Sequence, residues 1–442
     1  MTAPTPQAQA PLPSPAAPDF HEFETYESNV RSYCRDFPVL LSRAKGSQMY
    51  GADGSAYIDF FMGAGALNYG HNNDVMKDRL LAYIAADGIS HSLDFYTCAK
   101  QEFMEAFRRH ILEPRKLDYK MQFTGPTGTN AVEAALKLAR KVTGRSNVIA
   151  FSNAFHGMSL GSLAATASPK KRGGAGVALS GVTFVPYEGY LDGAFDSLGY
   201  IAQMLASGGG IDAPAAFIVE TIQGEGGLRY LSPAWFERLA ALARDCGALL
   251  IVDDIQSGCG RSGQFFSFEA AGVTPDIVCL SKSLSGYGLP FSMNLIKPCH
   301  DVWEAGEHNG TFRGNNLAFV TAKAALEAFW SDRDFEIALA RKIALLDERL
   351  GALVARIAHV IPGAALRGRG FMRGIFLDNA ELAQAVSSAA FEAGLIVETC
   401  GPRGEVVKLL PALTIDDEML GRGLDLLELA FDQALAPKLV SL

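Results

Sequence analysis

The sequence lacks the features that mark disulfide-rich, zinc-binding and nucleic-acid-binding proteins. Its seven cysteines lie far apart and form no CxxC pair, which argues against a disulfide framework and a structural metal site. We therefore expect no metal and a reducing, cytoplasmic location. The net charge is −9, and the one dense basic run, residues 170–172, is short and is typical of a solvated loop. The chain thus lacks the positive face that a nucleic-acid partner requires.

Long apolar runs are also absent. No stretch reaches the roughly 18 apolar residues that a membrane helix needs, so we expect no membrane partner. The N-terminus is rich in proline and alanine but has neither the basic start nor the apolar core of a signal peptide. We interpret residues 1–20 as a disordered tail, because proline-rich segments bury too little surface to become ordered.

The apolar content that is present suits a large enzyme. The chain has 442 residues, of which 49% are hydrophobic and 20% charged, and this allows two or three packed units. Residues 49–61 alternate around an Asp-Gly turn, which predicts a β-hairpin. Short apolar runs and helical patterns then alternate, which predicts an α/β fold with a mostly parallel sheet. The predicted strands are residues 148–151, 215–219, 248–252 and 276–280, with a helix at 233–247.

The pattern changes after residue 330. A long amphipathic helix, the run 367–377, a second helical stretch and the run 406–415 predict a separate α+β unit. We expect its sheet to pack with the N-terminal hairpin, so that the small domain is discontinuous. The predicted division is a small domain from residues 21–75 and 330–442 and a large domain from residues 76–329.

Polar residues follow three of the predicted strands. Glu220 and Asp253 end two of them, and Lys282 lies just past a third. Because ligands sit outside the carboxyl ends of parallel strands, one crevice would receive two carboxylates and an amine. Alone, such an Asp is more often a helix cap and such a Lys is usually exposed, but together they favour function. An amine in an apolar pocket is a good Schiff-base nucleophile, and a carboxylate can keep a pyridine nitrogen protonated. Lys282 and Asp253 suit these roles, and Lys282 could also carry the proton.

A helix start in residues 123–140 suits a phosphate. Thr127, Gly128 and Thr129 precede a strong helix former, in which Glu133 and Lys137 are spaced i,i+4. The backbone N–H groups at such a start would point at an anion, although plain helix caps share this pattern.

A second glycine-rich segment has a different interpretation. Residues 258–263, GCGRSG, satisfy G-x-G-x-x-G, but QFFSFE follows instead of a helix. The context of a dinucleotide site is therefore missing, and we predict a loop beside the cofactor.

From about residue 20 onward the chain resembles the class III aminotransferases of fold type I. The motifs are IVDDIQSGCGRSG (251–263), CLSKSLSG (279–286), AFHGMSLG (154–161), IVETIQGEGG (218–227) and HNGTFRGNN (308–316). The resemblance implies pyridoxal 5'-phosphate as cofactor, a fold with a large and a small domain, and at least a homodimer. It further implies that Asp253 faces the ring nitrogen, Gln256 meets the ring hydroxyl and Lys282 is the covalent anchor. Phe155 would stack on the ring beside His156, Thr127, Gly128 and Thr129 would bind the phosphate, and Thr311 would reach the neighbouring subunit's phosphate. Glu220, at its strand end, is expected at the cofactor as well.

More narrowly, the chain is similar to the diaminobutyrate–2-oxoglutarate aminotransferases of ectoine biosynthesis. The motifs are FETYESNVRSYCRDFP (23–38), FFMGAGALNYGHNN (60–73), QFTGPTGTNAVEAALKLARKVTG (122–144) and GEHNGTFRGNN (306–316). This implies amino transfer from glutamate to aspartate 4-semialdehyde, giving 2,4-diaminobutyrate and 2-oxoglutarate.

Two positions depart from the class pattern. Met158 and Lys408 stand where other members commonly have arginine, which disfavours an ornithine or 4-aminobutyrate substrate. By resemblance, Glu225 pairs with the cation at Lys408 and swings away when an α-carboxylate arrives. The alternative is an exposed lysine with a scaffold role. For the distal carboxylate of glutamate, Arg313 is a candidate, although a role at the dimer interface suits it equally.

The sequence leaves other functions open. Within the class they are another ω-aminotransferase, or a diaminobutyrate enzyme that serves siderophore assembly through the same site. Outside it they are a nicotinamide-dependent oxidoreductase, whose glycine fingerprint is missing, and a non-catalytic relative, which has no reason to keep both Lys282 and Asp253.

Overall fold

The computed structural model describes residues 19–191, 193 and 195–439. The predicted disordered tail lies outside these residues, except for residues 19 and 20. Among the described residues, no helix is long and apolar enough to cross a membrane.

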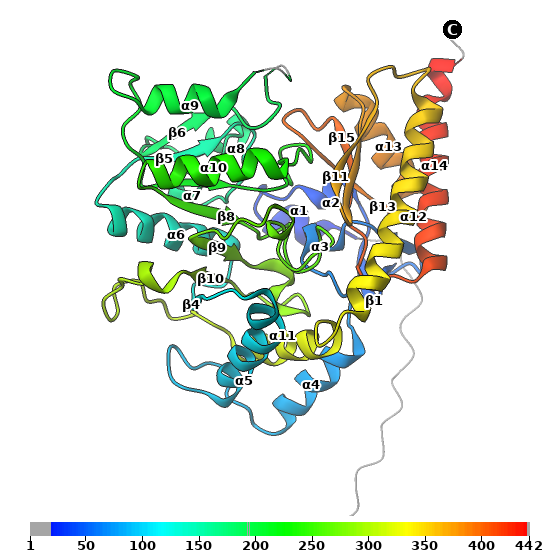
Figure 1. Ribbon diagram of the computed structural model, residues 1–442. Coiled ribbons are helices and arrows are strands. Elements are labelled where there is room, and N and C mark those ends of the chain that lie inside the picture. Colours follow the sequence, from blue (N-terminus) through cyan, green and yellow to red (C-terminus); the bar gives the residue numbers. More distant parts are fainter. Residues whose placement is uncertain (1–18, 192, 194, 440–442) are drawn as a thin grey trace, which may run out of the picture.

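A seven-stranded sheet with the order β4-β10-β9-β8-β7-β5-β6 lies within the larger part of the molecule, at the left in Figure 1. Its neighbouring strands pair in parallel, except that β10 is antiparallel to both β4 and β9. All four predicted strands are present, as β5, β7, β8 and β9, which confirms the α/β prediction. The strands are β4 (Lys120–Phe123), β5 (Val148–Phe151), β6 (Val182–Val185), β7 (Ala216–Val219), β8 (Leu249–Asp253), β9 (Ile277–Leu280) and β10 (Met293–Ile296).

Helices bury both faces of this sheet. In β8, Leu249 and Ile251 join the apolar cluster under α6, whereas Leu250 and Val252 join the cluster that includes Trp235 of α10. Burial on both faces explains why these strands are continuous apolar runs. The helices of this part are α4 (Asp74–Ala85), α5 (Cys98–Phe107), α6 (Gly128–Thr143), α7 (Leu160–Ala164), α8 (Pro169–Arg172), α9 (Ser197–Leu205), α10 (Pro233–Asp245) and α11 (Asn316–Phe329).

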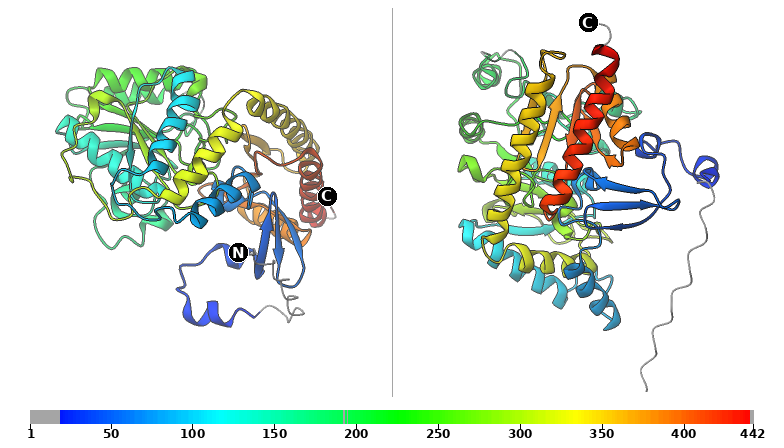
Figure 2. Two further views of the ribbon diagram at one scale, coloured as in Figure 1. Left: turned by 90° about the horizontal axis from the view of Figure 1, so that it is seen from below. Right: turned by 90° about the vertical axis from the view of Figure 1, so that its right-hand side faces the viewer.

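Two four-stranded sheets, β1-β2-β3-β13 and β11-β12-β15-β14, form the other part of the molecule (Figure 2). The predicted hairpin is present as β2 and β3, and β3 pairs in parallel with β13, through Ile58 and Leu395. The N-terminal hairpin and the C-terminal segment therefore share a sheet. This pairing supports the discontinuous small domain, whose boundaries remain our proposal.

The long helices α12 and α14 run side by side along this part (Figure 1), and Leu346, Ile375 and Phe431 belong to its apolar core. The strands are β1 (Leu41–Lys45), β2 (Gln48–Gly51), β3 (Ala56–Asp59), β11 (Ala365–Arg369), β12 (Met372–Phe376), β13 (Leu395–Ile396), β14 (Glu398–Cys400) and β15 (Val406–Leu409). The helices are α1 (His21–Tyr26), α2 (Tyr33–Asp36), α3 (Met62–Gly65), α12 (Asp334–Ile357), α13 (Ala380–Glu392) and α14 (Asp417–Leu439).

The glycine-rich segment 258–263 is a loop, as predicted. It contacts both the N-terminal and the C-terminal segments of the chain. Arg261 in this loop is fully buried. Its guanidinium donates to the side chain of Asn68 and to the backbone carbonyls of Phe371 and Pro411. The loop after β8 is therefore fixed against both the N-terminal and the C-terminal segments.

The prediction of a solvated loop at residues 170–172 is wrong. These residues form most of the short helix α8. Arg172 donates to the carbonyls of Leu163, Ala164 and Thr166, and the ammonium of Lys171 lies 4.0 Å from the centre of the Phe155 ring. The basic side chains were misjudged because their acceptors are backbone carbonyls and an aromatic face, which the local sequence does not reveal.

Candidate active site

A cavity of about 370 Å³ lies at the carboxyl ends of β7 and β8 and beside the segment after β9. Its position is the one expected for a ligand site in a parallel sheet. Ten of the predicted site residues line it together: Thr127, Gly128, Thr129, Phe155, His156, Glu220, Glu225, Asp253, Gln256 and Lys282.

Lys282 begins the 3₁₀ turn Lys282–Ser285 directly after β9. Its φ of 51° is in the left-handed region, which non-glycine residues seldom adopt and which concentrates at functional sites. Burial lowers the pKa of its amine, and the positive charge of Lys408 acts in the same direction, whereas Glu225 and Asp253 oppose the shift. A lowered pKa increases the fraction of neutral amine, which is the nucleophilic form.

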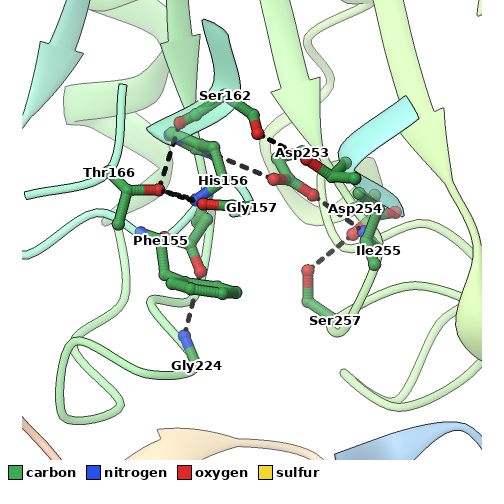
Figure 3. A network of polar contacts seen from close by, with 12 residues as sticks. Phe155, His156, Gly157, Ser162, Thr166, Gly224, Asp253, Asp254, Ile255 and Ser257 are labelled. Carbon is green, nitrogen blue, oxygen red and sulfur yellow. Dashed lines mark hydrogen bonds and ion pairs between the residues drawn. The ribbon is translucent and has the colours of Figure 1, made fainter. Parts of the chain in front are cut away.

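Asp253 is the last residue of β8 and is almost fully buried. One of its carboxylate oxygens lies 2.8 Å from His156 Nδ1, and the other accepts the N–H of Ile255 (Figure 3). Burial opposes protonation of His156, but the hydrogen bond and charge of Asp253, with the charge of Glu220, raise its pKa. The pair therefore holds the Asp253 carboxylate in a fixed orientation in the lining of the cavity.

Glu220, which follows β7, holds two loops of the cavity. Its carboxylate oxygens accept the backbone N–H groups of Phe155 (2.9 Å) and Gly224 (3.1 Å). Burial raises the pKa of Glu220 to about 7, and the charge of Asp253 contributes to that rise. Glu220 thus fixes the backbone of the loop that carries Phe155 against the loop at Gly224.

The residues predicted to bind an anion lie at the start of α6. Gly128 and Thr129 open the helix, and the Thr129 hydroxyl bonds the hydroxyls of Ser159 (2.6 Å) and Ser162. A Cβ at Gly157 would lie 2.4 Å from Thr129 Oγ1, so only glycine lets the two segments approach this closely. The N-terminal end of the helix is therefore open to the cavity and backed by hydroxyl groups.

Glu133 and Lys137, which are spaced i,i+4 on α6, bond other residues and not each other. Glu133 accepts the N–H groups of Gly161 and Ser162, and Lys137 donates to the carbonyl of Glu307. Glu133 thus holds the segment after Phe155 against the anion site.

These groups fit pyridoxal 5'-phosphate. Among the described residues, Gln256 Oε1 and His156 Nε2 are buried at the cavity without a hydrogen-bond partner, so Gln256 can still bond a ring hydroxyl. Asp253 offers a carboxylate for the ring nitrogen, the start of α6 offers N–H donors for a phosphate, and Phe155 offers a flat aromatic face.

Lys408 on β15 is fully buried, so it is not the exposed lysine of the alternative interpretation. Its ammonium lies 2.9 Å from Glu225 Oε1 and 2.8 Å from Glu398 Oε1. Burial opposes the charge, but these two carboxylates raise the pKa of Lys408 well above its usual value. Burial alone would raise the pKa of Glu225, but the positive charge of Lys408 outweighs burial and lowers it. For Glu398 burial is the larger effect, so its pKa is raised although Lys408 acts in the opposite direction.

Sequence reasoning missed Glu398. It stands in an apolar run, LIVETC, outside every cofactor motif. The Gly-rich segment 401–404 could have predicted it, because this segment indicates a hairpin turn. In a hairpin centred on residue 403, residue 398 lies opposite residue 408. The structure has that register.

Thr311 and Arg313 do not reach the cavity of their own chain. The carbonyl of Thr311 bonds His91, and Arg313 lies 3.8 Å from Asp94 beside a separate surface groove. Both residues are at the surface, so contributions to a neighbouring subunit's site remain predictions.

The sequence matches the Aminotransferase class-III family over residues 30–431, which is most of the chain. The chain therefore belongs to the class III aminotransferases, and it is an aminotransferase.

Among the similar proteins are several that carry the same enzyme name. The chain is 54% identical to the diaminobutyrate–2-oxoglutarate transaminase of Bordetella parapertussis over 422 residues, which are 95% of this chain and 96% of that one. It is also 54% identical to the protein of that name from Vibrio cholerae, over 92% of this chain and 98% of that one.

Solved structures agree with the fold. An ornithine aminotransferase of Toxoplasma gondii superposes with a TM-score of 0.81 at 25% identity, covering 95% of each chain. An S-selective transaminase of Arthrobacter sp. gives a TM-score of 0.83 at 20% identity, covering 94% of this chain and 98% of that one, which is a likeness of fold alone. The predicted fold type I is confirmed.

Proposed function

We propose that this aminotransferase binds pyridoxal 5'-phosphate and moves an amino group from glutamate to aspartate 4-semialdehyde, giving 2,4-diaminobutyrate and 2-oxoglutarate. The observation that carries the cofactor assignment is that Lys282, Asp253 and the start of α6 line one cavity. The substrate assignment rests on the activity for which the relatives at 54% identity are named. The sequence motifs favour a place in ectoine formation; siderophore assembly would use the same site.

The bound cofactor supplies an aldehyde that reacts with amines and a ring that accepts electrons. The chain's own groups do the rest. Lys282 is the covalent attachment point and, once released, holds and moves the proton at the substrate carbon. Asp253, oriented by His156 at 2.8 Å, would be the carboxylate that pairs with the ring nitrogen of the bound cofactor. Phe155 covers one face and limits access of water.

The two substrates place different groups at Lys408. Glutamate reacts at a carbon that carries a carboxylate, which needs a cation near Lys282. Diaminobutyrate reacts at its terminal CH₂, and an unmasked buried cation there would be costly. Glu225 at 2.9 Å masks Lys408, and about a quarter of its side chain is exposed, so it has room to move aside. We propose that this pair is the switch between the two substrates.

Replacing Lys408 with methionine tests the switch. We expect Lys408→Met to impair the glutamate half-reaction by roughly 2–4 kcal/mol in kcat/KM, because the substitution removes one partner of a buried charge pair. The diaminobutyrate half-reaction should fall much less. Stopped-flow measurement of both half-reactions decides, and equal losses or none would leave Lys408 a scaffold residue and return the search for the carboxylate anchor to Arg313.

A panel of half-reactions tests the substrate assignment. The cofactor-loaded enzyme is mixed in turn with glutamate, diaminobutyrate, ornithine and 4-aminobutyrate, and the absorbance of the cofactor is followed. Fast reaction with the first two and slow reaction with the last two is the expected result. Preference for ornithine or 4-aminobutyrate would make the enzyme another ω-aminotransferase.

We further propose that the enzyme works as a homodimer at least. Thr311 and the largely exposed Phe312 lie outside their own chain's cavity, as expected of a segment lent to a neighbour. Sedimentation analysis of wild type tests this, and a stable, fully active monomer would contradict it. A cytoplasmic location stays a prediction from cysteine usage.

A further inference from the structure

Lys408 has two carboxylate partners that are held in different ways. Glu398 and Lys408 are directly opposite each other on the antiparallel strands β14 and β15, so the backbone ladder fixes that pair. Glu398 is 5% exposed. Glu225 comes from the loop after β7 in the other part of the molecule, and its side chain is 26% exposed. One partner is therefore built into the strand pair, and the other can leave.

The charges show what the fixed partner contributes. If Glu225 were the sole partner, its departure would leave a bare ammonium in a fully buried position, at a cost that approaches the breaking of a buried ion pair. With Glu398 in place, departure of Glu225 leaves a neutral pair. A substrate carboxylate that then binds restores the charge that Glu225 had carried. The exchange of one carboxylate for the other therefore conserves charge.

Geometry gives Glu398 a second task. Lysine is a point charge on a flexible stem and lacks the rigid fork by which arginine holds a carboxylate. Its ammonium has three donors; it donates to Glu225 (2.9 Å) and to the Gly224 carbonyl (3.4 Å), and Glu398 Oε1 lies 2.8 Å away as an ion-pair partner. Glu398 keeps the ammonium in place when Glu225 is absent, so the vacated donor keeps its direction.

We propose that Glu398 is a positioning residue that serves as the permanent counter-ion of Lys408, so that Glu225 can withdraw and the α-carboxylate of the substrate can take its place. The inference rests on the proposed function, in which Lys408 receives that carboxylate. The raised pKa of Glu398, due to burial and then to the charge of Glu225, agrees with two carboxylates that compete for one ammonium.

The test uses Glu398→Gln in the cofactor-loaded enzyme. Without the fixed charge, opening of the Glu225–Lys408 pair leaves Lys408 uncompensated. We therefore expect the limiting rate at saturating glutamate to fall about tenfold or more, because removing one partner of a buried ion pair leaves the other charge uncompensated. Diaminobutyrate, which reacts while Glu225 stays on Lys408, should change less than about twofold.

The pH profile separates this role from a merely structural one. Besides Glu398, the groups that influence Lys408 are Glu225 and Cys400, with Lys282 and Tyr33 sharing the same field. Removing the charge of Glu398 lowers the pKa of Lys408 in the open state, so the alkaline limb of the glutamate half-reaction should move to lower pH by about one unit. The limb for diaminobutyrate should not move.

Two further variants serve as controls. Glu398→Asp keeps the charge and should keep the alkaline limb, even if its rate is reduced, and it remains informative if the glutamine variant folds poorly. Glu405→Gln makes the same change at a buried carboxylate that bonds the Arg403 N–H instead of Lys408, and it should leave the ratio of the two half-reactions unchanged.

Losses of equal size in both half-reactions of Glu398→Gln, with no movement of the alkaline limb, would overturn the inference. Failure of the proposed function would look different, because wild type itself would then prefer a donor other than diaminobutyrate. The role of Glu398 would then be tested by comparing the half-reaction rates of Glu398→Gln with glutamate and with that terminal-amine donor.

Discussion

Lys282→Ala is expected to reduce turnover below detection while the protein stays folded. The change removes both the covalent attachment point of the cofactor and the group that moves the proton at the substrate carbon. The Lys282 side chain lines the cavity, and its amine takes part in none of the ion pairs or side-chain hydrogen bonds between described residues, so we expect the fold to tolerate its loss. Steady-state assays with glutamate and aspartate 4-semialdehyde measure the loss.

Thermal melting shows whether that variant is folded. Lys77→Ala, at an exposed lysine of α4, is the matched control and should behave as wild type. Activity of Lys282→Ala close to the wild-type value would remove Lys282 from the mechanism.

Asp253→Asn should lower the rate by about 10² or more, by analogy with general-acid and electrostatic contributions elsewhere. An amide keeps the shape of the side chain but loses the charge that favours a protonated ring nitrogen. It also loses the charged partner of His156 at 2.8 Å. The measurement is the rate of each half-reaction in the cofactor-loaded variant.

The neighbouring residue provides the control for Asp253. Asp254 is equally buried, but its carboxylate accepts hydrogen bonds from Ser257 and Ser267 and lies outside the cavity lining. Asp254→Asn should lower the melting temperature and keep the half-reaction rates within about threefold. A reduction of only twofold in Asp253→Asn would refute the proposed role of that carboxylate.

The central sheet was predictable because its strands are buried on both faces and so appear as continuous apolar runs. The polar residues that end those runs, Glu220 and Asp253, and Lys282 just beyond them, were predictable as one site for the same reason, since parallel strands end at one edge. The structure brings all three to the cavity.

Contacts that depend on tertiary register were not predictable. Glu398 is adjacent to Lys408 only because β14 and β15 pair in one register, and β14 has three residues, which is too few for a periodic signal. Likewise, the spacing of Glu133 and Lys137 indicated a helix surface pair, but Glu133 meets Gly161 and Ser162 from a distant segment. Local patterns predict elements, whereas these partners are decided by how the elements pack.

The most direct test of the account is to locate the attachment of the cofactor. Purified enzyme loaded with pyridoxal 5'-phosphate should be yellow and should lose that colour on treatment with borohydride, which fixes the cofactor to its lysine. Peptide mapping by mass spectrometry should then find the reduced cofactor on Lys282, and the label should be absent in Lys282→Ala. A colourless enzyme, or a label on a different lysine in wild type, would contradict the assignment of this cavity as the cofactor site.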